Sequence, residues 1–271
     1  MLLSVISPAK RLRESPLSLD PLLTGLETLE PRFSDEVATL VQAARKLKAD
    51  GLKKTMRISD DLARLNAERF DHFALPKRDE LLNHAPTAQP ALHLFQGDVY
   101  QGLNAESLTV EQQRYAQSRL RILSGLYGLL RPFDLTQPYR LEMGSGIETE
   151  QGATLYAYWG DKITTALNED CSQIGAKAII NLASQEYWSA VKAPAVKFPV
   201  VTCQFKEWRG DQLKIISFSA KKARGLMVRF LLEQEVDDVA GLKDFTLERY
   251  RFDKARSDDQ NFVFTRKNEQ G

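Results

Sequence analysis

Short apolar runs that end in a turn recur along this chain, and they constrain its fold more than any other feature. Four runs read as β-strands, at residues 2–6, 91–95, 178–182 and 213–218. They are followed by Ser7-Pro8-Ala9-Lys10, Gly97-Asp98, Ser184-Gln185-Glu186 and a helix start near Ser219. Strands that alternate with helices build α/β folds, and adjacent hairpins make the sheet mixed. We therefore predict an α/β protein, α+β-like in that a mixed sheet is flanked by helices.

Helical signals fill much of the remaining sequence. We expect one helix from a Ser34 N-cap to a stop at Asp50-Gly51, and a second from Ser59 that buries Leu62, Leu65 and Phe70. The capping box Thr109-Val110-Glu111-Gln112 predicts a third helix, which runs to Leu123 and ends at Ser124-Gly125. Later elements are a helical face at Leu155, Trp159, Ile163 and Leu167, a hairpin around Arg209-Gly210-Asp211, a helix over residues 219–235, and strands at residues 245–252 and 261–265.

The chain of 271 residues has no internal repeat, no low-complexity tract and no Gly/Ser linker, so we expect one compact domain over residues 1–271. It lacks an N-terminal apolar stretch long enough for a signal peptide or a membrane span, which predicts a cytoplasmic protein with no membrane partner. Cys171 and Cys203 match no disulfide, redox or zinc spacing, and we interpret both as buried small hydrophobes. A monomer is the default oligomeric state.

The segment from Phe218 to Gly225 places three cations, Lys221, Lys222 and Arg224, in the first turns of a predicted helix. The helix macrodipole disfavours each cation at a helix N-terminus by roughly 0.3–1 kcal/mol. The cluster therefore destabilises the helix, and binding of a ligand would explain why it is present. Together with the free N–H groups of the helix start, these side chains are suited to gripping an anion. The alternative is a solvated charged face with no ligand.

A second basic stretch lies in a chain whose 37 basic and 36 acidic residues otherwise nearly balance. Between positions 114 and 140 five arginines accompany one acidic residue; they are Arg114, Arg119, Arg121, Arg131 and Arg140, against Asp134. Arginine offers a planar fork for phosphate oxygens, and Gly125 and Gly128 would let backbone N–H groups approach a phosphate. Tyr127 and Tyr139 are candidate stacking groups. The alternative is that the glycines only make turns and the tyrosines pack in the core.

Loops at the carboxyl ends of strands are where open α/β sheets bind their ligands. Lys10 and Lys221 follow two of the predicted strands, and Asp98 and Glu186 follow two others. If these loops converge, the lysines would hold phosphate or act as a base, with Asp98 or Glu186 as a partner carboxylate.

Several catalytic signatures are missing from the sequence. It has no Walker A run, no G-x-S-x-G elbow and no H-E-x-x-H. His72, His84 and His93 fall on dissimilar segments, so we expect no metal site and no cofactor.

Read together, several segments make the chain similar to the YaaA peroxide stress proteins of bacteria, nearly from end to end. The matching segments are Ile6-Ser7-Pro8-Ala9-Lys10, Met56-Arg57-Ile58-Ser59-Asp60, Gly97-Asp98-Val99-Tyr100, Leu123-Ser124-Gly125-Leu126-Tyr127-Gly128, Pro138-Tyr139-Arg140-Leu141-Glu142-Met143-Gly144, Tyr158-Trp159-Gly160-Asp161, Ile180-Asn181-Leu182-Ala183-Ser184 and Ala220-Lys221-Lys222-Ala223-Arg224-Gly225. The resemblance implies a cytoplasmic protein of the peroxide response that limits free intracellular iron and so Fenton damage. It also implies a family-specific single-domain fold, with a basic cleft and a helix-hairpin-helix element that bind double-stranded and branched DNA.

The helix-hairpin-helix would fall on the helix from Val110 to Leu123 and a hairpin at residues 124–128, although Gly125-Leu126-Tyr127-Gly128 is one residue longer than the usual Gly-hydrophobic-Gly turn. No ferritin-like Glu-x-x-His pair or cysteine cluster is present, so we expect any iron effect to be indirect.

Three functions remain in view. The leading hypothesis is a DNA-binding protein that contacts phosphates of duplex or junction DNA, with low sequence specificity, through Lys10, Arg121, Gly125, Gly128, Arg131, Arg140, Lys221, Lys222 and Arg224. The alternative is an enzyme that acts on a nucleotide, a nucleobase or another phosphate-bearing small molecule. The third is a scaffold or protein-interaction role.

Overall fold

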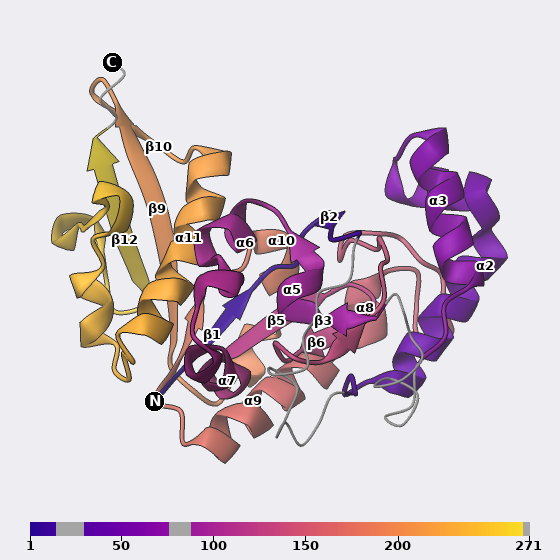
Figure 1. The fold of residues 1–271 in the computed structure, drawn as a ribbon, viewed down its shortest axis with the longest axis horizontal. Helices are drawn as coiled ribbons and strands as arrows, with labels where there is room; N and C mark the ends of the chain where they lie inside the picture. Colours follow the sequence, from indigo (N-terminus) through magenta and orange to yellow (C-terminus); the bar gives the residue numbers. More distant parts are fainter. Residues whose placement is uncertain (15–29, 76–87, 268–271) are drawn as a thin grey trace.

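The computed structural model describes residues 1–14, 30–75 and 88–267, and within them a mixed eight-stranded sheet forms the centre (Figure 1). The strand order is β11-β12-β9-β8-β1-β5-β6, with β10 paired to β9. The strands are β1 (Leu2–Ile6), β5 (Leu120–Ser124), β6 (Gly128–Leu130), β8 (Ala178–Asn181), β9 (Val200–Arg209), β10 (Gln212–Lys214), β11 (Arg251–Phe252) and β12 (Asn261–Lys267). The predicted mixed sheet flanked by helices is confirmed.

Five adjacent strands of this sheet, β5, β1, β8, β9 and β12, are parallel. Taken in chain order they run 2-1-3-4-5 across the sheet, a doubly wound order in which the chain reverses direction between the first and third strands, β1 and β8. At mid-strand Ser4 pairs with Leu120 on one side and Ile180 on the other. All five residues of β1 are buried, as expected of a strand enclosed on both faces. The crevice of a doubly wound sheet is therefore expected at the carboxyl ends of β1 and β8.

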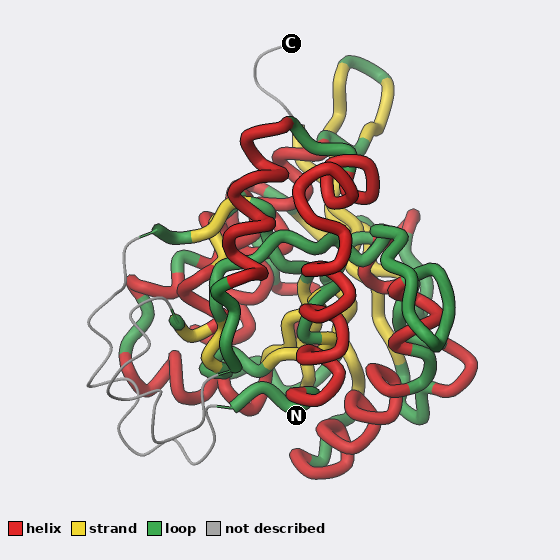
Figure 2. The backbone as a smooth tube through the Cα atoms, turned by 90° about the vertical axis from the view of Figure 1, so that its right-hand side faces the viewer, coloured by secondary structure: helices red, strands yellow, loops and turns green. Residues whose placement is uncertain are grey.

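Helices pack around the sheet, and two of them form a hairpin at one end of the molecule. The hairpin consists of α2 (Ser34–Met56) and α3 (Asp60–Asp71), at the opposite end from β9 and β12 (Figure 1). The β9–β10 hairpin projects beyond the body of the molecule (Figure 2). The other helices are α5 (Ala91–Leu94), α6 (Asp98–Leu103), α7 (Val110–Arg119), α8 (Leu155–Trp159), α9 (Lys162–Ile174), α10 (Gln185–Trp188) and α11 (Ser217–Glu233). Two small ladders pair β2 (Arg11–Leu12) with β4 (Phe95–Gln96), and β3 (Gln89–Pro90) with β7 (Leu135–Thr136).

Local signals were accurate where a specific cap or turn marks an element. The capping box at Thr109 and the Ser59 N-cap form as predicted, and Ser184 lies at the N-cap of α10. The hairpin turns at Arg209-Gly210-Asp211, where Arg209 pairs with Gln212. Cys171, Cys203 and Trp159 are buried.

Several predicted elements are wrong because a short apolar run fits a buried helix as well as a buried strand. Residues 91–94 form the buried helix α5 rather than a strand. The helix from Val110 ends at Arg119, because residues 120–124 pair with β1 as β5. Leu155 and Trp159 lie on α8 but Ile163 and Leu167 lie on α9, since the chain turns at Gly160, where φ is +49°. Of residues 245–252, only Arg251–Phe252 form a strand.

The end of α2 and the buried face of α3 also differ from expectation. Helix α2 continues past Gly51 to Met56, and its break lies at Lys48, where φ is 51°. Leu52 and Met56 are buried beyond that break, so tertiary packing overrides the glycine stop. Leu62 and Leu65 are exposed on α3, whereas Ala63, Asn66 and Phe70 are buried. Among the described residues, no helix combines the length and the apolar character needed to cross a membrane.

Helices α6 and α11 cross with their backbones in direct contact (Figure 1). A Cβ atom on Gly225 of α11 would lie 1.7 Å from the carbonyl oxygen of Val99, and one on Gly102 of α6 would lie 2.1 Å from the carbonyl oxygen of Lys222. Neither position therefore accepts a side chain without separating the helices. The crossing holds the first turns of α11 beside the start of α6.

We predict that Gly225→Ala lowers the free energy of unfolding by about 3 kcal/mol or more, because the added methyl group collides with backbone. Gly146→Ala is the matched control, since its Cβ would make only an ordinary contact, 3.6 Å from the carbonyl oxygen of Ala153. That control should change stability by less than about 0.5 kcal/mol. Urea unfolding of the three proteins measures both effects, and equal stabilities would show that the crossing is not tight.

Candidate functional site

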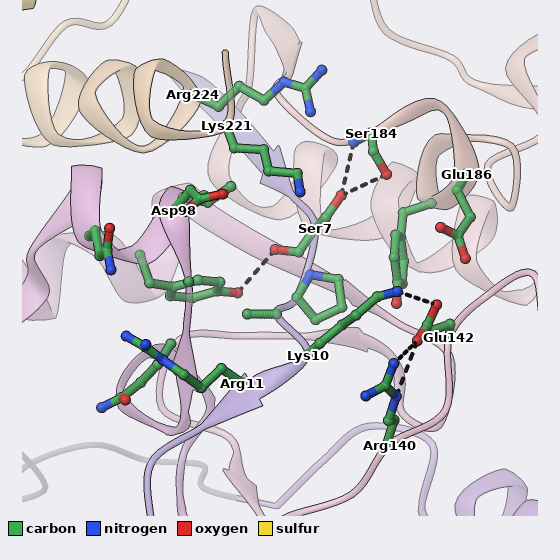
Figure 3. Close-up of a pocket in the computed structure, with 18 of the residues that line it drawn as sticks. Ser7, Lys10, Arg11, Asp98, Arg140, Glu142, Ser184, Glu186, Lys221 and Arg224 are labelled. Atoms are coloured by element: carbon green, nitrogen blue, oxygen red, sulfur yellow. Dashed lines mark hydrogen bonds and ion pairs between the residues drawn. The ribbon is translucent and has the colours of Figure 1, made fainter. Parts of the chain in front are cut away.

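A pocket of about 520 Å³ opens at the carboxyl ends of β1 and β8, where the doubly wound order places the crevice (Figure 3). Its walls come from five segments of the chain: residues 7–11, residues 96–101, residues 139–142, residues 184 and 186–187, and the first turns of α11. Six residues predicted from the sequence line it together: Lys10, Asp98, Arg140, Glu186, Lys221 and Arg224. Lys10, Asp98, Glu186 and Lys221, whose loops we expected to converge, do lie around one pocket, and Arg140 and Arg224 join them.

The loops that follow β1 and β8 are joined directly by Ser7. The backbone N–H of Ser184 donates to Ser7 Oγ at 2.8 Å, and the two serine hydroxyls lie 3.3 Å apart. The Tyr100 hydroxyl donates to the Ser7 carbonyl oxygen at 3.1 Å, which ties the same loop to α6. These hydrogen bonds connect three of the segments that line the pocket and fix their relative positions.

The cations of the pocket differ in whether a carboxylate already neutralises them. Lys10 Nζ lies 2.9 Å from one oxygen of Glu142, and Arg140 Nη2 lies 3.0 Å from the other, so two cations share one anion. Lys221 and Arg224 have no acidic partner in the described part of the chain. In Figure 3 Lys221 extends from α11 toward Ser7. Burial lowers the pKa of the Arg224 guanidinium, as expected for a charge held partly out of water without a counterion.

Three carboxylates face these cations. Glu142 is occupied by Lys10 and Arg140, and one oxygen of Glu186 accepts the backbone N–H of Gly144 at 3.0 Å. Asp98, the first residue of α6, is half-buried, and its carboxylate makes no hydrogen bond or ion pair within the described ranges. Five cationic side chains and three carboxylates therefore line one pocket, which is positive overall but mixed in sign.

Aromatic side chains complete the walls. Tyr139 and Tyr187 are almost fully buried but contribute to the lining. Burial raises the pKa of both hydroxyls, so each stays protonated at neutral pH. The Tyr139 hydroxyl lies 2.6 Å from Ser124 Oγ, at the carboxyl end of β5. Tyr127, the other candidate stacking residue, is instead buried in the core and contacts Tyr139 edge-on.

The structure does not bring the remaining predicted residues to the pocket. Arg121 is only 4% exposed in β5, and its Nε lies 2.6 Å from the buried carboxylate of Asp170. Arg131 pairs with the buried Asp134 at 2.7 Å, and Lys222 pairs with Glu248. The stretch from Arg114 to Arg140 is therefore not one basic surface. Arg121 neutralises Asp170, which is distant in sequence, and Arg131 neutralises Asp134, which is close in sequence.

Gly125 and Gly128 have packing roles rather than open N–H groups. A Cβ on Gly125 would lie 2.3 Å from the Leu141 carbonyl oxygen, and Gly128 has a φ of +69° with the Trp159 ring against it. Ser124 pairs with Gly128, so residues 120–130 form a β-hairpin of β5 and β6. The helix-hairpin-helix predicted at residues 110–128 is wrong at this position, because α7 is followed by two paired strands.

Two further charged residues, Arg11 and Glu142, line the pocket without having been predicted from the sequence. Glu142 stands in the matching segment Pro138–Gly144, but nothing in its spacing indicates that it joins Lys10 to Arg140. Arg11 is an exposed residue of β2, placed at the pocket by the pairing of β2 with β4.

Neither cysteine lines the pocket. Burial raises the pKa of Cys171 and of Cys203 to about 12, so both thiols are protonated at neutral pH. Within the described residues, no three His, Cys, Asp or Glu side chains group as a metal site. His84 lies outside those residues.

Comparison with known proteins places the chain in a family. A family model described as peroxide stress protein YaaA matches residues 2–256. The chain belongs to this family. It is 46% identical over 265 residues to a UPF0246 protein of Idiomarina loihiensis, with 98% of each chain covered. It is 47% identical over 266 residues to a UPF0246 protein of Caulobacter vibrioides, covering 98% of this chain and 99% of that one. Membership of the YaaA family supports a role in oxidative stress.

Proposed function

We propose that this member of the YaaA family binds DNA in the response to hydrogen peroxide, through phosphate contacts at the pocket and its rim. The observation that carries the proposal is the pair Lys221 and Arg224, which enter the pocket from the first two turns of α11 without an acidic partner in the described chain. The cost of placing cations at a helix N-terminus is offset when an anion binds between them.

Lys10 and Arg140 add to this anion-binding capacity. Both contact Glu142, so one of their two positive charges remains uncompensated. The Lys10 side chain is 65% exposed, so a ligand at the rim of the pocket can reach it while it contacts Glu142. In duplex or branched DNA each internal phosphodiester carries a single negative charge, and only a terminal phosphate carries two. Several separated cations therefore suit the DNA backbone better than one dense cluster. Contacts of this kind carry little sequence specificity.

We predict a strong salt dependence that depends on Lys221 and Arg224. If four phosphates are neutralised, log affinity falls against log salt with a slope of about −3.6. The double variant Lys221→Gln/Arg224→Gln should lose about two of those contacts, which reduces the slope to about −1.8. Fluorescence anisotropy with a labelled duplex and a labelled four-way junction, over a salt series, measures both slopes.

Lys222→Gln is the matched control, because Lys222 pairs with Glu248 instead of lining the pocket. It removes a charge from the same helix turn and should leave the slope within about half a unit of the wild-type value. Circular dichroism and thermal unfolding establish that all variants fold. A salt-independent wild type would remove the proposal, and equal losses in the control and the double variant would move the contacts away from the pocket.

The resemblance to the YaaA family also implies that the protein limits free intracellular iron. We propose that this effect follows from DNA binding. We predict that cells carrying only the Lys221→Gln/Arg224→Gln variant accumulate chelatable iron after peroxide treatment, as cells without the protein would. Electron paramagnetic resonance of chelated iron in whole cells measures this pool. A wild-type level of chelatable iron in cells whose variant no longer binds DNA would show that iron limitation does not depend on DNA binding.

A second candidate is an enzyme that acts on a nucleotide, a nucleobase or another phosphate-bearing small molecule. Its support is the size and position of the pocket: about 520 Å³ lies within the range of roughly 300–1,000 Å³ that is usual for small-ligand sites. The pocket also combines Lys10 and Lys221 with Asp98 and Glu186, the groups that acid–base chemistry would need.

Thermal unfolding with a panel of nucleotides and nucleosides tests this candidate. A ligand present at 100 times its dissociation constant stabilises the protein by roughly 2.7 kcal/mol, which raises the melting temperature by several degrees. The enzyme hypothesis predicts such a shift for at least one nucleotide in the wild type and its loss in Lys221→Gln/Arg224→Gln. No shift with any of them would count against it.

A further inference from the structure

The carboxylates in the pocket favour a ligand that carries hydrogen-bond donors. The sugar–phosphate backbone of DNA has none, because its phosphate and deoxyribose oxygens only accept hydrogen bonds. A wall built solely to hold backbone phosphates would therefore be weakened by Asp98 and Glu186, which repel them. Within DNA, N–H donors occur only on the base edges.

Asp98 is the carboxylate most available to such a donor. Glu142 is engaged by Lys10 and Arg140, and Glu186 by the Gly144 N–H, whereas neither oxygen of Asp98 has a partner in the described part of the protein. Asp98 begins α6, which the glycine crossing holds against α11, so it shares one end of the pocket with Lys221 and Arg224 (Figure 3). A carboxylate without a partner in the described chain thus shares the pocket with two such cations.

We propose that the pocket accepts the base of one unpaired nucleotide, with Asp98 accepting hydrogen bonds from its Watson–Crick edge while Lys221 and Arg224 hold the adjoining phosphates. This inference rests on the proposed DNA binding and adds to it a preference for unpaired nucleotides. Paired bases cannot offer this edge, and extrusion is easiest for a base without a partner. Tyr139 and Tyr187 line the walls against which a planar base would pack.

The chemistry of a carboxylate predicts which base fits best. Two carboxylate oxygens accept two hydrogen bonds side by side, and guanine alone presents two adjacent donors, N1–H and the N2 amino group, on its Watson–Crick edge. Adenine, cytosine and thymine each offer one donor position there. We therefore expect unpaired guanine to bind most tightly and an abasic position to give no gain over paired DNA.

The test is a set of labelled duplexes that differ only at a central one-nucleotide bulge: guanine, adenine, cytosine, thymine, an abasic analogue, or no bulge. Anisotropy at one salt concentration should show the guanine bulge bound about tenfold more tightly than the abasic bulge, the gain expected of hydrogen bonds to a charged acceptor. The wild-type series alone can overturn the inference: equal affinity for all bulges and for the duplex would do so, while leaving the proposed DNA binding intact.

Variants of Asp98 then locate the effect. Asp98→Ala should abolish the guanine preference while duplex affinity stays the same or rises, because a negative charge beside the phosphates is removed. Asp98→Asn keeps one acceptor oxygen and should retain part of the preference. Asp211→Ala, which removes an exposed carboxylate from the β9–β10 turn, is the matched control and should behave as the wild type.

The outcomes separate the two claims. A guanine preference that survives in Asp98→Ala would overturn the role of Asp98 in base recognition. A purely electrostatic role would make Asp98→Ala strengthen binding to every DNA equally, which would also overturn it. Failure of the wild type to bind any of the DNAs would overturn the proposed function itself.

Discussion

The contact between α6 and α11 is the interaction on which the site depends. Gly102 and Gly225 let the two helices approach until backbone meets backbone, and the start of each helix then faces the same pocket. Lys221 and Arg224 arrive from one helix and Asp98 from the other. The hydrogen bond between Ser7 and Ser184 likewise holds the loops after β1 and β8 together, at the point where the strand order of the sheet reverses. The pocket is thus positioned by a close helix crossing and by a side-chain-to-backbone hydrogen bond, both between elements far apart in sequence.

Ion pairing separates the cations that neutralise buried carboxylates from those that lack an acidic partner in the described chain. Arg121 is buried and Arg131 partly buried, each beside a buried aspartate, Asp170 or Asp134, and removing either partner of such a pair would leave an uncompensated charge. Lys221 and Arg224 lack such partners in the described chain. A protein of nearly zero net charge can in this way present a locally positive site.

The sequence predicted the α/β class and six of the pocket residues, because turns after strands and clustered cations are local signals. It failed where the outcome depends on distant partners. Residues 120–124 look like the end of a helix until β1 is available to pair with them, and Arg121 looks like a phosphate ligand until Asp170 lies 2.6 Å away. Likewise, no local pattern reveals that Glu142 bridges Lys10 and Arg140. Strand pairing and ion pairing are long-range interactions, and a single sequence does not display them.

The decisive measurement is a structure of the protein bound to a four-way DNA junction. We expect backbone phosphates within hydrogen-bond distance of Lys221 Nζ and the Arg224 guanidinium, with the DNA lying across the mouth of the pocket between β1 and β8. DNA bound on another face, with the pocket open to solvent and both cations free, would contradict it.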